Sequence, residues 1–325
     1  MTMLSRVADH LYWMSRYLER SEHTARMIDV FYNLVLEQAP ESAARHWDKL
    51  LASLEFGSTF AELEKSGLDS HQLTQTLTFD ADNPSSIYSC IRGARDNARN
   101  VRELISSEMW SELNRLYLGV TEARRDEEIG AHPHDFYQAV KEGAQLFQGI
   151  TDSTTYRGPG WNFIQLGRFV ERARSLAVLL EAQFKHAKNE EYLDLVALLK
   201  CCTAFEAFCK VYSPELQRAR IVQFLLLNSE FPHSVRFAVD RIDRSLRRIS
   251  DNAPQANSTR LLRLTGRLVA SLRYGTLEEI LAQGLPGFLE EIRRQLADIH
   301  DAMYATYIAY PIEHALEPVS AGEFW

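Results

Sequence analysis

The stretch Arg16-Tyr17-Leu18-Glu19-Arg20 decides the fold of this chain, because it occurs twice. It returns 152 positions later as Arg168-Phe169-Val170-Glu171-Arg172. Two further stretches recur in the same order at nearly the same offset: Leu77, Asp80, Pro84, Ser86, Ile87 and Arg99 against Leu225, Asn228, Pro232, Ser234, Val235 and Arg247, and Asp135, Phe136 and Val140 against Gly287, Phe288 and Ile292. These matches predict an internal duplication, with residues 1–150 and 151–325 as two diverged halves of domain size.

Apolar residues recur with a helical period along most of the chain, and alternating stretches are almost absent. Prolines and glycines interrupt the pattern, and the segments between them predict five helices in each half. The second predicted helix covers 42–64, and those of the second half lie near 160–187, 190–212, 232–250, 257–282 and 286–310. We therefore predict an all-α protein whose two five-helix halves form one compact unit with pseudo-twofold symmetry, joined by a loop at 151–161.

The overall composition narrows the classes of function. The 36 basic and 44 acidic residues give a net charge of −8, which argues against a nucleic-acid binder. The longest apolar run is too short to cross a bilayer, and no signal peptide is recognisable at the start, so we expect a soluble, cytoplasmic protein without membrane contact. Phosphate-binding loops and metal-ligand motifs are missing from the sequence, and we expect no metal and no cofactor.

Acidic side chains fall on the face of the first helix that ought to be buried. Glu22 and Asp29 lie in the middle of the apolar stripe, with Glu19 and Arg26 on its shoulder. Buried carboxylates are costly unless they are paired and hydrogen-bonded. One interpretation is an ion-pair network between helices; the other is a cleft that receives a charged ligand or the acidic segment of a partner.

A row of arginines follows the apolar stripe of the helix predicted to begin near Pro84. Arg92, Arg95, Arg99 and Arg102 follow one another at steps of 3, 4 and 3 and face either a neighbouring helix or the same cleft. The second half has Asp243 and Ser250 where the first has Arg95 and Arg102. A ligand site of this kind should therefore be asymmetric and belong to the first half.

Two more sets of residues invite a structural and a functional interpretation. Arg16 and Arg20 fall opposite the apolar stripe, so solvated pairing with Glu19 within the helix is the default, and a shared role where the halves meet is the alternative. In the predicted joining loop, Asp152, Thr155 and Arg157 offer groups suited to binding, although such residues also serve as caps and turn formers.

Several motifs of the chain resemble the bacterial alpha-E domain family. The resemblance is carried by the opening stretch Met3–Arg20, by Ala94-Arg95-Asp96-Asn97-Ala98-Arg99 with Ser107-Glu108-Met109-Trp110, and by Gly149-Ile150-Thr151-Asp152 leading to Trp161-Asn162-Phe163. Ser15 stands where the family more often has glycine. The resemblance implies an all-helical fold, in agreement with the periodicity.

For function, the resemblance implies a partnership with a circularly permuted ATP-grasp ligase of the amide-forming type, and a transglutaminase-like peptidase as a second associated protein. We therefore expect a helical accessory subunit that binds the ligase or its peptide-like substrate through the Arg/Glu cleft. The acids would pair a substrate amine and the arginines a carboxylate or acyl-phosphate. The alternatives are an enzyme that uses a carboxylate such as Glu22 as general acid or base, and an architectural module that forms a homodimer.

Overall fold

All regular elements in the described part of the chain are α-helices, which confirms the predicted all-α class. The computed structural model describes residues 5–35, 40–65, 67, 69–125, 133–185, 192–212, 215–255 and 257–309. Up to residue 154 the helices are α1 (Ser5–Val35), α2 (Pro40–Ser53), α3 (Phe60–Lys65), α4 (Ser70–Phe79), α5 (Ile87–Asn100), α6 (Ser107–Arg125) and α7 (Pro133–Thr154). They continue as α8 (Pro159–Phe184), α9 (Tyr192–Cys201), α10 (Phe205–Val211), α11 (Arg218–Leu227), α12 (Val235–Asn252), α13 (Ser258–Tyr274), α14 (Leu277–Gln283) and α15 (Leu285–Tyr307).

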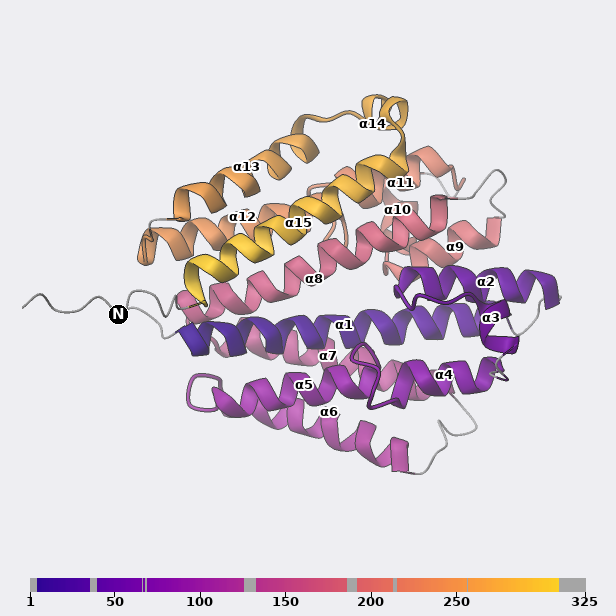
Figure 1. Cartoon of the computed structure of the whole chain (residues 1–325), viewed down its shortest axis with the longest axis horizontal. Coiled ribbons are helices and arrows are strands. Elements are labelled where there is room, and N and C mark those ends of the chain that lie inside the picture. Colours follow the sequence, from indigo (N-terminus) through magenta and orange to yellow (C-terminus); the bar gives the residue numbers. More distant parts are fainter. Residues whose placement is uncertain are drawn as a thin grey trace, which may run out of the picture.

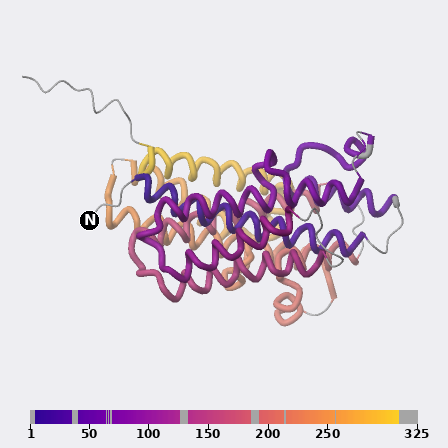
Figure 2. The backbone as a smooth tube through the Cα atoms, turned by 90° about the horizontal axis from the view of Figure 1, so that it is seen from below, coloured from indigo at the N-terminus to yellow at the C-terminus, as the bar shows by residue number. Residues whose placement is uncertain are grey.

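The helices α1 and α8 run side by side through the middle of the molecule (Figure 1). Helices α5 and α7 pack against α1 on one side, and α12 and α15 pack against α8 on the other. Seen from below, the long helices share one long axis (Figure 2). Each central helix is therefore surrounded by other helices. None of the helices in the described ranges is long and apolar enough to cross a membrane.

Two matched serines start the helices that pack most closely on α1 and α8. The Ser86 hydroxyl accepts a hydrogen bond from the Ser89 amide at the start of α5, and Ser234 does the same for Phe237 in α12. Each hydroxyl also donates to a carbonyl of the preceding connection, that of Asp80 or Asn228. Such capping satisfies amides that have no partner within the helix. The predicted duplication stays an inference from sequence, and these local structures correspond as it requires.

Several predicted boundaries were wrong, because short breaks do not interrupt an apolar pattern. The segment 42–64 is divided into α2 and α3 by a connection in which Glu55 and Gly57 have positive φ, a region that disfavours helix. The segments 190–212 and 257–282 are likewise two helices each, and α4 and α11 were not predicted. The joining loop is also shorter than predicted, since α7 continues to Thr154 and α8 begins at Pro159.

The two central helices approach each other closely at Gly167. A Cβ atom at this position would lie 2.2 Å from the carbonyl oxygen of Tyr12 and 3.3 Å from the Cβ of Ser15. Only a glycine lets the backbones come so close. This approach brings the two repeated stretches, which follow directly on each helix, face to face.

Candidate functional site

The two repeated stretches bind each other reciprocally across the α1–α8 interface. Arg16 Nε and Arg20 Nε of α1 donate to Glu171 of α8 at 2.7 and 2.6 Å. In return, Arg172 of α8 donates to both carboxylate oxygens of Glu19 on α1, at 2.5 and 2.9 Å. Arg168 Nε completes the set at 3.8 Å from Glu19. We call these six residues the reciprocal Glu-Arg pairs.

Burial makes these pairs electrostatically strong. Glu171 is 1% exposed. Burial alone would raise the pKa of its carboxyl, but the guanidinium groups of Arg16 and Arg20 outweigh this effect and lower the pKa to about 2. For Arg168, burial and the neighbouring Arg172 lower the pKa of the guanidinium to about 10. Burial is the larger of these two causes, and the positive charge of Arg172 adds to it.

The default prediction for Arg16 and Arg20 was wrong. It placed both side chains in solvent and paired them within their own helix. In the structure Arg16 is 7% exposed, and the partner of both arginines is Glu171, 151 or more residues away. The reason is that α8 covers the face of α1 that the periodicity assigned to water. The alternative prediction, a role where the two halves meet, describes the observed contacts.

The acids predicted on the buried face of α1 are all occupied by neighbouring side chains. Glu22 pairs with Arg26 on the same helix and accepts hydrogen bonds from Gln145 and Gln148 of α7, each at 3.2 Å. Burial alone would raise the pKa of Glu22, but Arg26 and Arg172 lower it. Asp29 binds His134 and Lys141 of α7, both at 2.7 Å. These contacts are those of a network between helices.

The arginine row of α5 faces α6 and not the acids of α1. Arg95 donates to Asn114 at 2.9 Å, and its guanidinium lies 4.6 Å from the ring centre of Tyr117. Arg102, which lies in the turn after the end of α5, is 5.6 Å from the Trp110 ring, and Arg99 is exposed. The acids and arginines of the predicted cleft therefore do not meet. The acids of α1 face α7 and α8, and the arginines face α6.

The three residues predicted in the joining loop form a local surface structure. Asp152 belongs to α7, and Arg157 binds its carboxylate at 3.2 Å and its carbonyl at 2.7 Å. The Arg157 guanidinium also stacks on Trp161 at 4.4 Å. Thr155 donates to the sulfur of Met109 at 3.4 Å. Arg157 thus connects the end of α7 to the start of α8, and Thr155 contacts α6.

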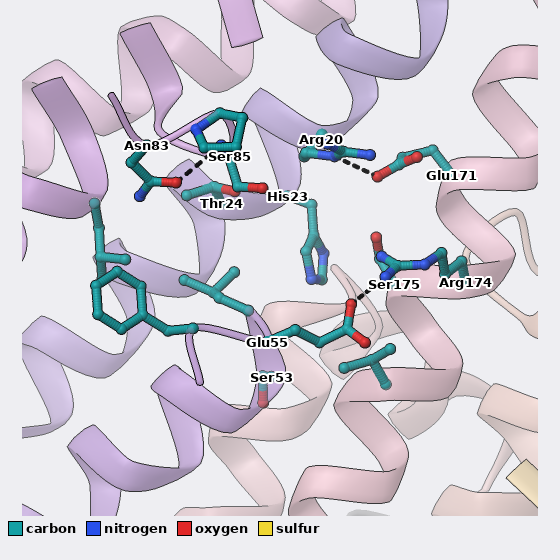
Figure 3. A pocket seen from close by; sticks show the side chains of 15 residues that line it. Arg20, His23, Thr24, Ser53, Glu55, Asn83, Ser85, Glu171, Arg174 and Ser175 are labelled. Atoms are coloured by element: carbon teal, nitrogen blue, oxygen red, sulfur yellow. Dashed lines mark hydrogen bonds and ion pairs between the residues drawn. The ribbon is translucent and has the colours of Figure 1, made fainter. Parts of the chain in front are cut away.

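A polar cavity of about 500 Å³ opens directly beside the reciprocal Glu-Arg pairs. Its wall comes from α1, from the end of α2 and the connection after it, from α4 and the α4–α5 connection, and from α8. Arg20 and Glu171 line one side, and Glu55 with Arg174 lines the opposite side (Figure 3). The volume falls in the range of small-molecule sites. We call this space the interhelical cavity.

His23 lies between these two charged sides, with its ring in the cavity (Figure 3). The residue is 9% exposed, and its Nε2 atom has no hydrogen-bond partner among the described residues. Burial and the nearby Arg26 lower the pKa of its imidazole to about 4. His23 is therefore neutral at physiological pH, and its ring lines the cavity without using Nε2.

The carboxylate on the far side of the cavity is held in an unusual backbone conformation. Glu55 has φ of 53°, a left-handed value that is uncommon outside glycine. Its side chain pairs with Arg174 of α8 and, at 2.6 Å, with Arg293 of α15. Arg293 in turn binds Glu181 at 2.7 Å. The connection after α2 is thereby attached to α8, in the middle of the chain, and to α15, near its end.

Sequence reasoning missed most of this cavity. The repeated stretches identified Arg20 and Glu171, and the matched Pro84 region identified the α4–α5 connection that faces them. Nothing in the pattern pointed to Glu55, because its segment was predicted as the interior of a helix. His23 lies one turn after the first repeated stretch, and that position was the available signal.

The fold and these pairs define a class: an all-helical domain whose two central helices exchange Glu-Arg contacts. The chain belongs to the Alpha-E family, which it matches over residues 3–308 and which is described as a predicted alpha-helical domain with a conserved ER motif. Glu19-Arg20 and Glu171-Arg172 are its two Glu-Arg dipeptides. No solved structure matches the chain significantly.

The relatives found among curated proteins are much longer than this chain. An uncharacterized protein of Mycobacterium bovis is 25% identical over 333 residues, which cover 94% of this chain and 37% of the relative. Uncharacterized proteins of two Mycobacterium tuberculosis strains match with the same identity and coverage. The chain thus spans little more than a third of the length of these relatives.

Proposed function

We propose that this protein is a recognition subunit of an amide-ligase system of the ATP-grasp type, and that it holds a peptide-like compound in the interhelical cavity. The observation that carries the proposal is the cavity itself, a space of about 500 Å³ that exposes charged and hydroxyl groups from distant segments of the chain. A domain without its own ATP-binding motif would contribute binding and orientation, while the ligase would contribute the chemistry.

The cavity replaces the cleft as the recognition surface. Glu22 and Asp29 already bind side chains of α1 and α7, so they are not available to a substrate amine. The longer relatives support a modular role, because in each of them the region that matches this chain is accompanied by further sequence. The proposed ligase partnership itself comes from the family resemblance.

Two other functions are less well supported. A general acid or base at Glu22 would need a raised pKa in an open pocket, whereas the pKa of Glu22 is lowered and its carboxylate is enclosed. A purely architectural module would have no pocket, and the interhelical cavity counts against it. A homodimer and a transglutaminase-like peptidase as second partner are compatible with the proposed role.

Capture of the tagged protein from its native cells, followed by mass spectrometry, tests the partnership. We expect an ATP-grasp ligase to be enriched, and we expect the purified ligase to form amide product faster when this protein is added. The variant Arg92→Lys, which lies on α5 and outside the cavity, should capture and stimulate the ligase as well as the unmodified protein does. If a ligase is neither recovered nor stimulated, the proposed partnership is wrong.

A further inference from the structure

The reciprocal Glu-Arg pairs contain more positive than negative charge. Four guanidinium groups share two carboxylates, which leaves two positive charges in excess inside the molecule. The adjoining pair of Glu22 and Arg26 is neutral and does not change this balance. Buried charge without a counter-charge is costly, so this region favours an anion.

The excess charge reaches the cavity at Arg20. Its Nε is used by Glu171, and among the described residues no acceptor binds its two terminal nitrogens. The side chain of Arg20 is 21% exposed, compared with 2% for Arg172, its counterpart on α8. Arg172 Nη1 instead donates to the carbonyl of Pro232 at 3.2 Å. The terminal nitrogens of Arg20 in the first repeated stretch therefore have no acceptor among the described residues. The corresponding Arg172 in the second stretch uses one of its terminal nitrogens to bind a backbone carbonyl.

The carboxylates of the cavity wall, in contrast to Arg20, already have partners for their polar atoms. Glu171 accepts from Arg16 and Arg20, and Glu55 accepts from Arg174 and Arg293. Arg20 and Arg174 line the cavity together with these two acids, and Arg16 and Arg293 lie behind them. An ammonium group would therefore find no unoccupied carboxylate, whereas an anion would find Arg20.

The ring of His23 lines the same cavity beside Arg20 (Figure 3). Its Nε2 is enclosed by protein atoms and has no partner among the described residues, so this nitrogen reaches a ligand only after the ring turns. The arginine fork by itself matches the planar geometry of a carboxylate. A phosphate also fits an arginine fork, but it lacks the amide and apolar groups of a peptide-like compound.

The rest of the wall suits the body of a peptide-like compound. Thr24, Ser85 and Ser175 bring hydroxyls, which hydrogen-bond to amide groups. Leu54, Leu77 and Val178 provide apolar surface for a side chain.

We infer that the interhelical cavity binds the free carboxylate end of an amino-acid derivative or short peptide, with the terminal nitrogens of Arg20 as its donors and the ring of His23 beside it. This inference rests on the proposed function, because it names the ligand that the recognition subunit would hold. It also specifies polarity: the carboxyl end enters the cavity, and the amino end points away from Arg20.

Nuclear magnetic resonance of the full chain tests the inference, with labelled histidine rings and labelled leucine and valine methyl groups. The probes are N-acetylalanine, its uncharged carboxamide, and inorganic phosphate, each raised to about 20 mM so that a site of millimolar Kd is saturated. We expect N-acetylalanine to give saturable shifts at His23, Leu54, Leu77 and Val178. The carboxamide and phosphate should bind at least about tenfold more weakly.

Two variants locate the contact. Arg20→Lys keeps the charge beside Glu171 but loses the fork, and it should weaken N-acetylalanine binding about tenfold. Arg92→Lys, on α5 and outside the cavity, should leave binding unchanged. If Arg20→Lys does not fold, the comparison of acid with carboxamide in the unmodified protein decides alone.

Three results would overturn the inference: no saturable shift, shifts outside the cavity, or equal or tighter binding of the carboxamide or phosphate. The outcome is separable from that of the ligase experiment. Recovery of a ligase without carboxylate binding would leave the partnership intact and refute the ligand. Carboxylate binding without a ligase would establish the site and refute the partner.

Discussion

The carbonyl oxygen of Tyr12 lies where a side chain at Gly167 would have to go. A Cβ at residue 167 would stand 2.2 Å from that oxygen, well inside contact distance. Because both groups belong to the backbones of central helices, neither can move aside without separating α1 from α8. The reciprocal Glu-Arg pairs lie within one or two turns of this contact on each helix. Their distances therefore depend on how closely α1 and α8 pack.

The variant Gly167→Ala should therefore be strongly destabilised, by roughly 1–3 kcal/mol or more in the free energy of unfolding, because an added methyl overpacks the contact. Gly149→Ala is the matched control, since this glycine lies in α7 and a Cβ there meets nothing within 4 Å. The control should gain up to about 1 kcal/mol from helix propensity. Urea unfolding measures both; equal effects would contradict the close approach.

Removing the charge of Glu171 should destabilise the protein in a pH-dependent way. In the folded state its pKa is about 2, below the ordinary 4.5, so its contribution is fully present above pH 4.5 and is lost as the pH falls towards 2. At pH 7 we expect Glu171→Gln to lower the free energy of unfolding by about 3 kcal/mol. The difference should shrink below pH 4.

Glu142→Gln is the control for this measurement, because Glu142 is exposed on α7 and bonds only to Gln138 among the described residues. It should change stability by less than about 0.5 kcal/mol. A Glu171→Gln protein as stable as the unmodified chain at pH 7 would show that the pairs do not stabilise the fold.

His23 should control stability in a different pH window. Its pKa is about 4 in the folded protein and 6.5 ordinarily, so between these values the unfolded chain binds the extra proton. Stability should consequently rise with pH from 4 to 6.5 and level off above. His23→Gln should flatten this part of the profile, while Glu171→Gln should keep it. An unchanged slope in His23→Gln would mean that this imidazole is not held neutral.

The class of fold could be predicted because helical periodicity and repeated motifs are local properties of the sequence. The environment of Arg16 could not. A helical wheel assumes one buried face, whereas α1 is enclosed by α5, α7 and α8, and its residues from Ser21 to Asp29 are all buried. In such a helix a charged side chain opposite the apolar stripe meets another helix instead of water.

The candidate site was predictable only where both halves share a motif. Arg20 and Glu171 belong to the repeated stretches, but the sequence could not show which opposing residue each would bind. Glu55 reaches the cavity because a left-handed residue turns the chain after α2, and an apolar pattern does not register such a turn. His23 carried no distinguishing signal beyond its position one turn after Arg20.

The arginine row of α5 gives the remaining prediction, because it distinguishes a structural cluster from a ligand site. Arg95 holds α6 through Asn114 and the Tyr117 ring, so Arg95→Gln should lower the free energy of unfolding by about 1 kcal/mol. It should leave N-acetylalanine binding and ligase capture unchanged, as neither contact reaches the cavity. Arg99→Gln is the control, since Arg99 is exposed and should have almost no effect on stability. If a folded Arg95→Gln protein no longer captures the ligase, the arginine row belongs to the recognition surface. The ligase would then bind the face formed by α5 and α6.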